Sequence, residues 1–179
     1  MHVKIFMFGR TLKTNSFKLT HREPTEEAGS FRAFGVQDNM AIKPAQKETL
    51  KVILDANAWF VPLQFKIDIF SDLKRLLNRN FEAILLSPVK RELEAHAEKG
   101  SPKMRKNAAY ALKLAAKCKY VEVDAPVSAP TDDIIVKIAK EWGSPVFTND
   151  RLLRKRLRDI SVPVIYVRQK SRLEIDGMI

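Results

Sequence analysis

Residues 51–58 read KVILDANA, and residues 145–150 read PVFTND. In each segment a short apolar run ends at an acid, Asp55 in the first and Asp150 in the second. Short β-rich runs of this kind, when they alternate with helical periodicity, are typical of parallel sheets. Such sheets bind ligands beyond the carboxyl ends of their strands, so the two acids predict a cation site at one edge of the sheet.

The rest of the chain alternates strand-like and helix-like segments. Leu63, Ile67, Phe70, Leu73 and Leu77 recur every three or four residues, which predicts an amphipathic helix after the first strand. Further strands are predicted at residues 83–86, 120–123, 144–148 and 162–167, and further helices at 88–99, 104–117, 131–142 and 151–158. This order predicts an α/β fold, a three-layer α/β/α sandwich around a mostly parallel central sheet.

Capping residues set the expected helix limits. Ser87 and Pro88 stand in the order favoured at a helix start. Thr131 is the expected N-cap of the helix that follows it, and Gly143 is its expected C-terminal stop.

Size and composition favour one globular domain with an extension. The chain has 179 residues, of which 45% are hydrophobic, and this suffices for one core. We expect a domain over residues 50–179 and an N-terminal extension over residues 1–49, where periodicity is weak. The extension is interpreted as a flexible tail or short hairpin, or alternatively as sequence upstream of a natural start at Met40.

Cysteine content and hydropathy exclude several classes of protein. Cys118 is the only cysteine, which excludes an intramolecular disulfide and a Cys-based zinc ribbon. No apolar run approaches the roughly 20 residues needed to span a bilayer, and residues 1–9 make a poor secretory signal. We therefore expect a cytoplasmic protein with no membrane partner.

The charge balance points to a polyanionic partner. Lys and Arg number 32 against 21 Asp and Glu, which gives a net charge of +11. Such an excess favours nucleic acid over an acidic protein as the partner, although a lysine-rich solvated surface is the simpler alternative.

Four acids fall at the ends of predicted elements, namely Asp55, Glu92, Asp132 and Asp150, with Asp133 beside Asp132. If they converge, their repulsion requires either a proton or a divalent cation. Oxygen ligands without His or Cys select Mg²⁺ or Mn²⁺ over zinc, and these ions bind phosphate oxygens and activate water. The alternative is that Asp132, Asp133 and Asp150 only cap helices or interact with helix dipoles.

The position of Glu92 follows from its helix. Val89, Leu93 and Ala97 form the buried stripe, so Glu92 lies about 100° away, at the boundary between core and solvent. From there its carboxylate can reach the edge of the sheet. The alternative is a simple ion pair with His96, one turn later.

Two helix faces concentrate cations. The first consists of Lys106, Tyr110, Lys113 and Lys117, and the second consists of Arg151, Arg154 and Arg158. Such faces can hold a nucleic-acid backbone without reading its sequence. Alternatively, both are ordinary solvated faces of amphipathic helices.

Four motifs resemble, in order and spacing, those of PIN-domain ribonucleases. They are LDAN at residues 54–57, SPV at 87–89 followed by EL at 92–93, TDDI at 131–134 and TNDR at 148–151. The closing segment, residues 162–177, looks like the archaeal branch of that family. This branch is similar both to VapC-type toxin ribonucleases and to the PIN nucleases of eukaryotic small-subunit ribosomal RNA processing. The resemblance covers about residues 50–177.

The resemblance implies a PIN-like sandwich with a metal-dependent active site. The implied catalytic residues and ligands of Mg²⁺ or Mn²⁺ are Asp55, Glu92, Asp132 and Asp150, with Asn57, Asp133 and Thr148 in support. Asp55 and Asp150 are the implied principal ligands, and Glu92 and Asp132 ligate the metal or orient water. The doublet leaves the choice between Asp132 and Asp133 open.

The implied reaction is hydrolysis of an RNA phosphodiester that leaves a 5′-phosphate, with Arg151 or Arg154 as a phosphate contact. The implied partners are RNA, an antitoxin or a ribosome-assembly factor, and a second copy of the chain in a homodimer.

Other enzyme classes fit less well. A phosphate-transfer enzyme of the haloacid dehalogenase type needs a second Asp two residues after the first, where this chain has Asn57. A receiver domain would need an acceptor Asp and a late Lys, for which there is no convincing pair. No glycine-rich phosphate loop exists among the six glycines. The serious alternative is a catalytically inactive RNA-binding or ribosome-assembly factor that keeps the PIN-like fold.

Overall fold

The structure, a computed structural model, describes residues 4–5, 49–126 and 128–179. The hypotheses for residues 1–49, including the start at Met40, fall almost entirely outside these residues and stay predictions. The domain limits at residues 50 and 179 likewise stay a prediction.

The described residues form seven strands and seven helical segments. The strands are β1 (Lys4–Ile5), β2 (Leu50–Leu54), β3 (Phe81–Leu86), β4 (Lys119–Glu122), β5 (Val146–Phe147), β6 (Val164–Arg168) and β7 (Arg172–Asp176). The helices are η1 (Ala56–Phe60, a 3₁₀ helix), α1 (Val61–Phe65), α2 (Ile69–Leu77), α3 (Ser87–Lys99), α4 (Pro102–Ala115), α5 (Thr131–Trp142) and α6 (Arg151–Asp159).

The strands form one sheet in the order β1-β4-β3-β2-β5-β6-β7. Strands β4, β3, β2, β5 and β6 pair in parallel, whereas β1 pairs antiparallel with β4 and β7 pairs antiparallel with β6. The chain moves outward from β2 through β3 to β4, then returns to the other side of β2 for β5 and β6. The order of strands therefore reverses between β2 and β5.

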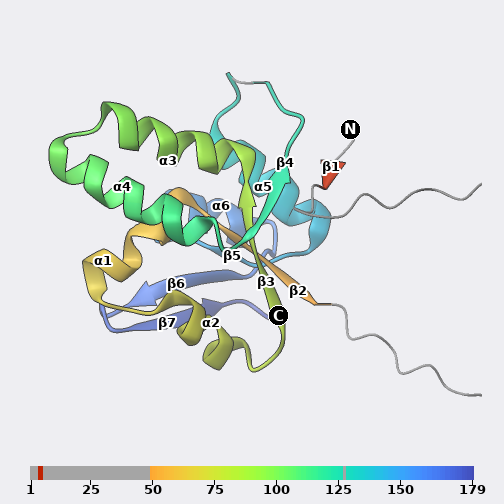
Figure 1. The fold of residues 1–179 in the computed structure, drawn as a ribbon. Coiled ribbons are helices and arrows are strands. Elements are labelled where there is room, and N and C mark those ends of the chain that lie inside the picture. The colour runs from red at the N-terminus through yellow and green to blue at the C-terminus, as the bar shows by residue number, and fades with distance from the viewer. Residues whose placement is uncertain (1–3, 6–48, 127) are drawn as a thin grey trace, which may run out of the picture. The chain divides into compact units, whose positions relative to one another are not determined.

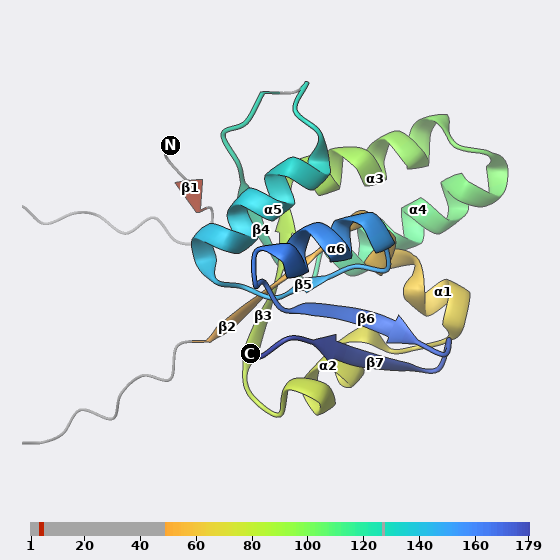
Figure 2. The same cartoon turned by 180° about the vertical axis from the view of Figure 1, so that it is seen from behind.

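Helices cover both faces of the sheet, which confirms the predicted α/β/α sandwich. Figure 1 looks onto the face that carries α1, α2 and α4, and Figure 2, from behind, shows α5 and α6 on the opposite face. Helices α3 and α4 form an antiparallel hairpin that packs on η1. The centre of the sheet is fully buried, with Ile53, Leu54, Ile84 and Phe147 at 0 or 1% exposure, so its apolar runs are covered on both faces.

The single helix predicted from Leu63 to Leu77 is wrong in its continuity. Lys66 has a left-handed backbone conformation (φ 59°) that ends α1, and Asp68 then caps α2 by accepting hydrogen bonds from Phe70 N and Ser71 N. Asp68 is a favoured N-cap residue, and its capping bonds start a new helix here. Hydrophobic spacing continues across the break and conceals it.

Two expected helix starts also differ in detail. Helix α5 begins at Thr131, but Pro130 holds the N-cap position and no side chain caps the helix, so the prediction of Thr131 as N-cap is wrong. Helix α3 begins at Ser87 as expected, yet the Ser87 hydroxyl accepts a hydrogen bond from Val123 N at 3.0 Å, beyond β4, instead of capping its own helix. Gly143 ends α5 with φ 59°, as predicted.

Strand β7 was not predicted. Its sequence, RLEID, alternates charged and apolar residues, and Leu173 is its one fully buried side chain. Helix α2 packs near it and covers its inner face. Within the described part of the chain, no helix has the length and apolar character of a membrane span.

Candidate active site

Two neighbouring strands bring the first and last motifs together. Strand β2 ends at Leu54 and β5 ends at Phe147, and the two strands pair in parallel. Asp55 N donates to Phe147 O at 3.1 Å, and Thr148 N continues the ladder to Ile165 O at 3.0 Å. Since the strand order reverses between β2 and β5, this is the point where open α/β sheets bind ligands.

Asp55 is the buried centre of a small polar cluster. Its side chain is 5% exposed. Its Oδ1 accepts from Ala56 N at 2.6 Å, and its Oδ2 accepts from Asn57 Nδ2 at 2.6 Å and from Thr148 Oγ1 at 2.7 Å. Asn57 Nδ2 also donates to Thr148 Oγ1 at 3.1 Å, which closes the triangle. We call Asp55, Asn57 and Thr148 the Asp55 cluster.

Burial raises the pKa of Asp55 from 3.8 to about 6. The hydrogen bonds from Thr148 and Ala56 act in the opposite direction, and the charges of Glu92 and Asp132 raise the pKa further. The carboxylates of Glu92 and Asp132 therefore lie within electrostatic reach of Asp55. Three of the four predicted site acids are thus electrostatically coupled.

The acid doublet at the start of α5 separates into two roles. Burial raises the pKa of Asp132, and the charge of Asp150 raises it further. Asp133 instead forms an exposed ion pair with Arg156 of α6. Of the two, Asp132 lies within electrostatic reach of Asp55 and Asp150. Asp133 pairs with Arg156.

Asp150 is the N-cap of α6, as the alternative interpretation anticipated. Its Oδ1 accepts from Leu152 N at 2.7 Å and from Leu153 N at 3.0 Å. Both bonds fall on one oxygen, and within residues 49–126 and 128–179 no donor contacts Oδ2. Asp150 N donates to Thr148 Oγ1 at 3.0 Å, which ties this acid to the Asp55 cluster.

Glu92 lies at the boundary that its helical position predicts. Its side chain is 40% exposed, and its Oε1 lies 3.9 Å from His96 Nε2. The His96 ring in turn meets Phe60 of η1 edge-on, with ring centroids 6.4 Å apart. Glu92 therefore lies both beside His96 and within electrostatic reach of Asp55.

The acids are near one another without forming a closed ligand shell. Among the described residues, no three Asp, Glu, His or Cys side chains lie close enough together to hold a metal ion. The Glu92 carboxylate instead lies nearest to His96.

Asn149 is a site residue that sequence reasoning missed. Its Oδ1 accepts from Val167 N of β6 at 2.8 Å, and its backbone N donates to Asn57 Oδ1 at 2.9 Å. Asn149 thus links the Asp55 cluster to the end of β6. Its place between Thr148 and Asp150 was the only signal in the sequence, because its hydrogen-bond partners are distant along the chain.

The first cationic face lies on the surface of the α3–α4 hairpin. Lys106, Tyr110, Lys113 and Lys117 are all exposed, and Tyr110 is 41% exposed. Lys117 follows the end of α4 at Ala115, two residues earlier than predicted. These side chains are available to a partner in solution.

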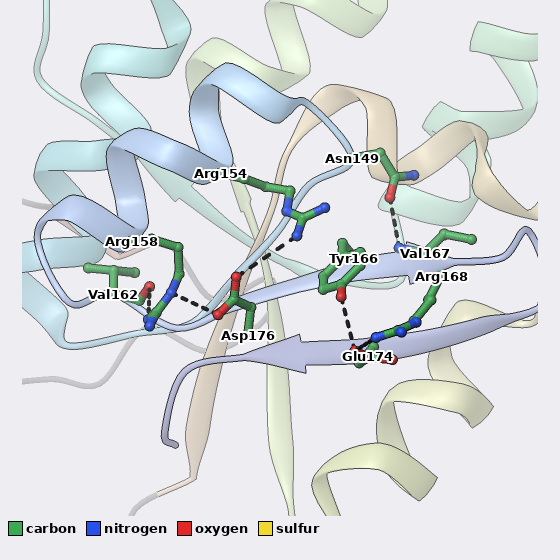
Figure 3. A network of polar contacts seen from close by, with 9 residues as sticks. All are labelled: Asn149, Arg154, Arg158, Val162, Tyr166, Val167, Arg168, Glu174 and Asp176. Carbon is green, nitrogen blue, oxygen red and sulfur yellow. Dashed lines mark hydrogen bonds and ion pairs between the residues drawn. The ribbon is translucent and has the colours of Figure 1, made fainter.

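The second cationic face is partly engaged within the protein (Figure 3). The Arg154 guanidinium lies over the Tyr166 ring, 3.6 Å from its centroid, and 3.9 Å from an Asp176 carboxylate oxygen. Arg158 Nε lies 3.0 Å from the other carboxylate oxygen of Asp176. Both arginines fasten α6 to the β6–β7 hairpin, whereas Arg151, at the start of α6, is exposed.

Sequence comparisons with known proteins all indicate the same family. Residues 52–170 match the family described as "PIN like domain". The chain is 35% identical over 130 residues to Ribonuclease VapC4 of Methanocaldococcus jannaschii, a match that covers 72% of this chain and 98% of the relative. It is 25% identical over 124 residues to Ribonuclease VapC9 of Archaeoglobus fulgidus, covering 69% and 87%.

Solved structures agree with these sequence matches. The fold is similar to that of the PIN domain endonuclease Utp24, with a TM-score of 0.60 and 26% identity over 72% of this chain and 92% of the other. It is also similar in fold to a domain of a Methanocaldococcus jannaschii protein of unknown function, with a TM-score of 0.52, 18% identity and coverage of 73% and 99%.

Proposed function

The chain belongs to the PIN-domain ribonucleases, and from that premise we propose that it hydrolyses phosphodiester bonds in RNA with the help of a divalent cation. The proposed active site is the Asp55 cluster together with Glu92, Asp132 and Asp150. Relatives named as ribonucleases or endonucleases over the same residues support this activity.

The observation that carries the proposal is the environment of Asp55. A carboxylate that is 5% exposed, with a pKa raised to about 6 and two further acids in electrostatic reach, is costly to keep in a fold. Carboxyl groups with strongly shifted pKa values cluster at functional sites. A divalent cation would remove the repulsion and restore the ionised form.

The donor set fits Mg²⁺ or Mn²⁺. The candidate ligands are carboxylate oxygens from Asp55, Glu92, Asp132 and Asp150, and hard oxygen donors select these ions over zinc. A bound ion of this kind neutralises phosphate oxygens and lowers the pKa of a bound water.

The position of each of the four acids decides its proposed role. Asp55 and Asp150 are the principal ligands, with Asp55 held by Asn57 and Thr148 and Asp150 presenting its uncapped Oδ2. Glu92 and Asp132, which are both half-buried, ligate from the sides or accept a proton from the attacking water. We assign Asp132 and not Asp133, because Asp133 is paired with Arg156.

The substrate backbone is positioned by cations beside the acids. Arg151 is exposed at the start of α6, next to Asp150, and is the first candidate for a phosphate contact. Arg154 is a weaker candidate, because its guanidinium already lies over Tyr166 and near Asp176. Cleavage leaves a 5′-phosphate in this scheme.

The resemblance to the PIN-domain ribonucleases supports two cellular settings. A VapC-type role would include an antitoxin as partner, and a role in ribosomal RNA processing would include a ribosome-assembly factor. A homodimer is compatible with either role. The genes beside this one distinguish the two, since a toxin is usually encoded next to a small antitoxin.

The proposal is tested by mapping RNA ends after incubation with the full-length protein and Mn²⁺. Wild type should produce new 5′-phosphate ends, and Asp55→Asn should abolish them while RNA affinity remains. Asp124→Asn, which changes an exposed aspartate in the loop after β4, is the matched control and should cleave normally. RNA binding by wild type without any cleavage would overturn the proposal in favour of a binding factor.

A further inference from the structure

A groove of about 490 Å³ lies on the side of the molecule that carries α4. One wall is formed by Tyr110, Leu114 and Lys117, and the other by Pro62, Lys66 and Phe70 from the end of α1 and the start of α2. We propose that this groove is a subsite for one nucleotide of single-stranded RNA, with its base against Tyr110 and Phe70 and a phosphate on Lys66 and Lys117. This inference rests on the proposed ribonuclease function and adds a place for the substrate.

The groove has the chemistry of a base-stacking site. Tyr110 is 41% exposed, although it is large and aromatic, and Phe70 opposite it is half-buried. Aromatic side chains bind unpaired bases of any sequence through their flat faces, whereas bases inside an RNA duplex cannot enter such a groove. The volume is in the range of sites that hold small organic groups.

The charges at the groove favour a polyanion over an apolar peptide. Lys66 and Lys117 are exposed at its rim. The one acid, Asp68, is ionised and lies within electrostatic reach of Lys117, so the groove keeps a net positive charge from Lys66; the Asp68 oxygens accept from the Ser71 hydroxyl at 2.8 Å and from two backbone amides as the N-cap of α2. Lys106 and Lys113 continue the positive charge along α4, so a phosphate backbone finds cations on both sides of the groove.

The groove also lies within reach of the acids. Helix η1 begins directly after Asp55, α1 follows it, and Pro62 of α1 lines the groove. The five residues of η1 span about 10 Å at roughly 2 Å per residue. Helix α4 packs against η1 as well. When the scissile bond of an RNA strand lies at Asp55, a nucleotide a few positions away from that bond therefore lies in the groove.

The test measures RNA binding in EDTA, which separates binding from cleavage. The probe is a fluorescein-labelled oligouridylate of about ten nucleotides, a length that fits known single-strand sites. Tyr110→Ala should weaken its affinity about tenfold, whereas Tyr110→Phe should bind as wild type does, because stacking needs the ring and not the hydroxyl. Lys117→Ala should lower the slope of log K against log salt concentration by about 0.7. Lys140→Ala, which changes an exposed lysine of α5, is the control and should leave affinity unchanged.

Cleavage assays then distinguish failure of the subsite from failure of the proposed function. A uridine dinucleotide is too short to reach the groove from the acids, so Tyr110→Ala should lose less activity on it than on the ten-nucleotide RNA. Asp55→Asn should cleave neither RNA. If wild type cleaves nothing, the binding measurements still decide the subsite. If Tyr110→Ala and Lys117→Ala both bind the oligouridylate as wild type does, the groove is not an RNA subsite.

Discussion

In the absence of metal, the protein should lose stability as the pH rises from about 4 to about 6, because Asp55 must then ionise inside the fold. Asp55 is 5% exposed, and burial raises its pKa from 3.8 to about 6. The unfolded chain keeps the usual value of 3.8. Between these two pH values the folded protein therefore holds a proton that the unfolded chain has released.

The size of this effect follows from linkage. The contribution of Asp55 to stability is fully present below its unfolded pKa and is lost as the pH rises through the folded pKa. The two pKa values lie about 2 pH units apart, and each unit corresponds to about 1.4 kcal/mol, so the loss is about 3 kcal/mol. Mg²⁺ or Mn²⁺ should reduce the loss, because a cation stabilises the ionised carboxylate in the folded state.

The assay is urea unfolding in EDTA at several pH values between 4 and 7.5, followed by the fluorescence of buried Trp59. Other groups titrate over this range too, and Asp68, whose pKa the Ser71 hydroxyl lowers, acts in the opposite sense. The informative quantity is therefore the difference between wild type and Asp55→Asn, which cannot ionise. This difference should change by about 3 kcal/mol in favour of the variant as the pH rises.

The control is Asp124→Asn, since Asp124 is exposed in a loop. This variant shows how much pH dependence the loss of a surface carboxylate brings by itself. If the Asp55→Asn difference depends on pH no more than the control's does, the Asp55 carboxyl is not desolvated in the folded protein, and the reasoning from its burial is refuted.

Three further predictions concern other residues of the candidate site and of α6. Asp132→Asn should reduce the cleavage rate by about a hundredfold or more, whereas Asp133→Asn should leave it nearly unchanged, and equal losses in initial-rate assays would remove the distinction between them. Asn149→Ala should weaken Mn²⁺ affinity or lower kcat by about 10- to 100-fold with little change in KM, because it removes the side-chain bond to Val167 N that holds the 148–150 segment against β6. An effect on KM alone would contradict this positioning role. Arg154→Ala should cost about 1–2 kcal/mol in urea unfolding through loss of its contact with Tyr166, and it should leave oligouridylate affinity intact if the arginine is structural.

The layers of the fold were predictable from sequence because they depend on local periodicity. Apolar runs such as residues 51–54 become buried strands wherever helices cover both faces of a sheet. Strand β7 has no such run, and it forms because β6 offers a partner edge and α2 offers a surface to Leu173. Those contacts cannot be read from RLEID alone. The break at Lys66 was hidden for a similar reason, since its left-handed conformation leaves the hydrophobic spacing intact.

The candidate site was predicted in part by the chain and in part by resemblance. Acids at strand ends indicated a site, but periodicity does not tell which strands are neighbours, and β2 lies beside β5, which is far away in the sequence. The motifs of the PIN-domain ribonucleases supplied that pairing. The split between Asp132 and Asp133 depends on Arg156, and the role of Asn149 depends on Val167, so both required the three-dimensional structure.

The most direct test of the account is the position of Mn²⁺ in crystals grown with that ion, located by its anomalous scattering. We predict a peak bound by Asp55 and the uncapped oxygen of Asp150, with Glu92 turned away from His96 toward it. Active, Mn²⁺-loaded crystals in which these carboxylates bind no ion would contradict the central claim.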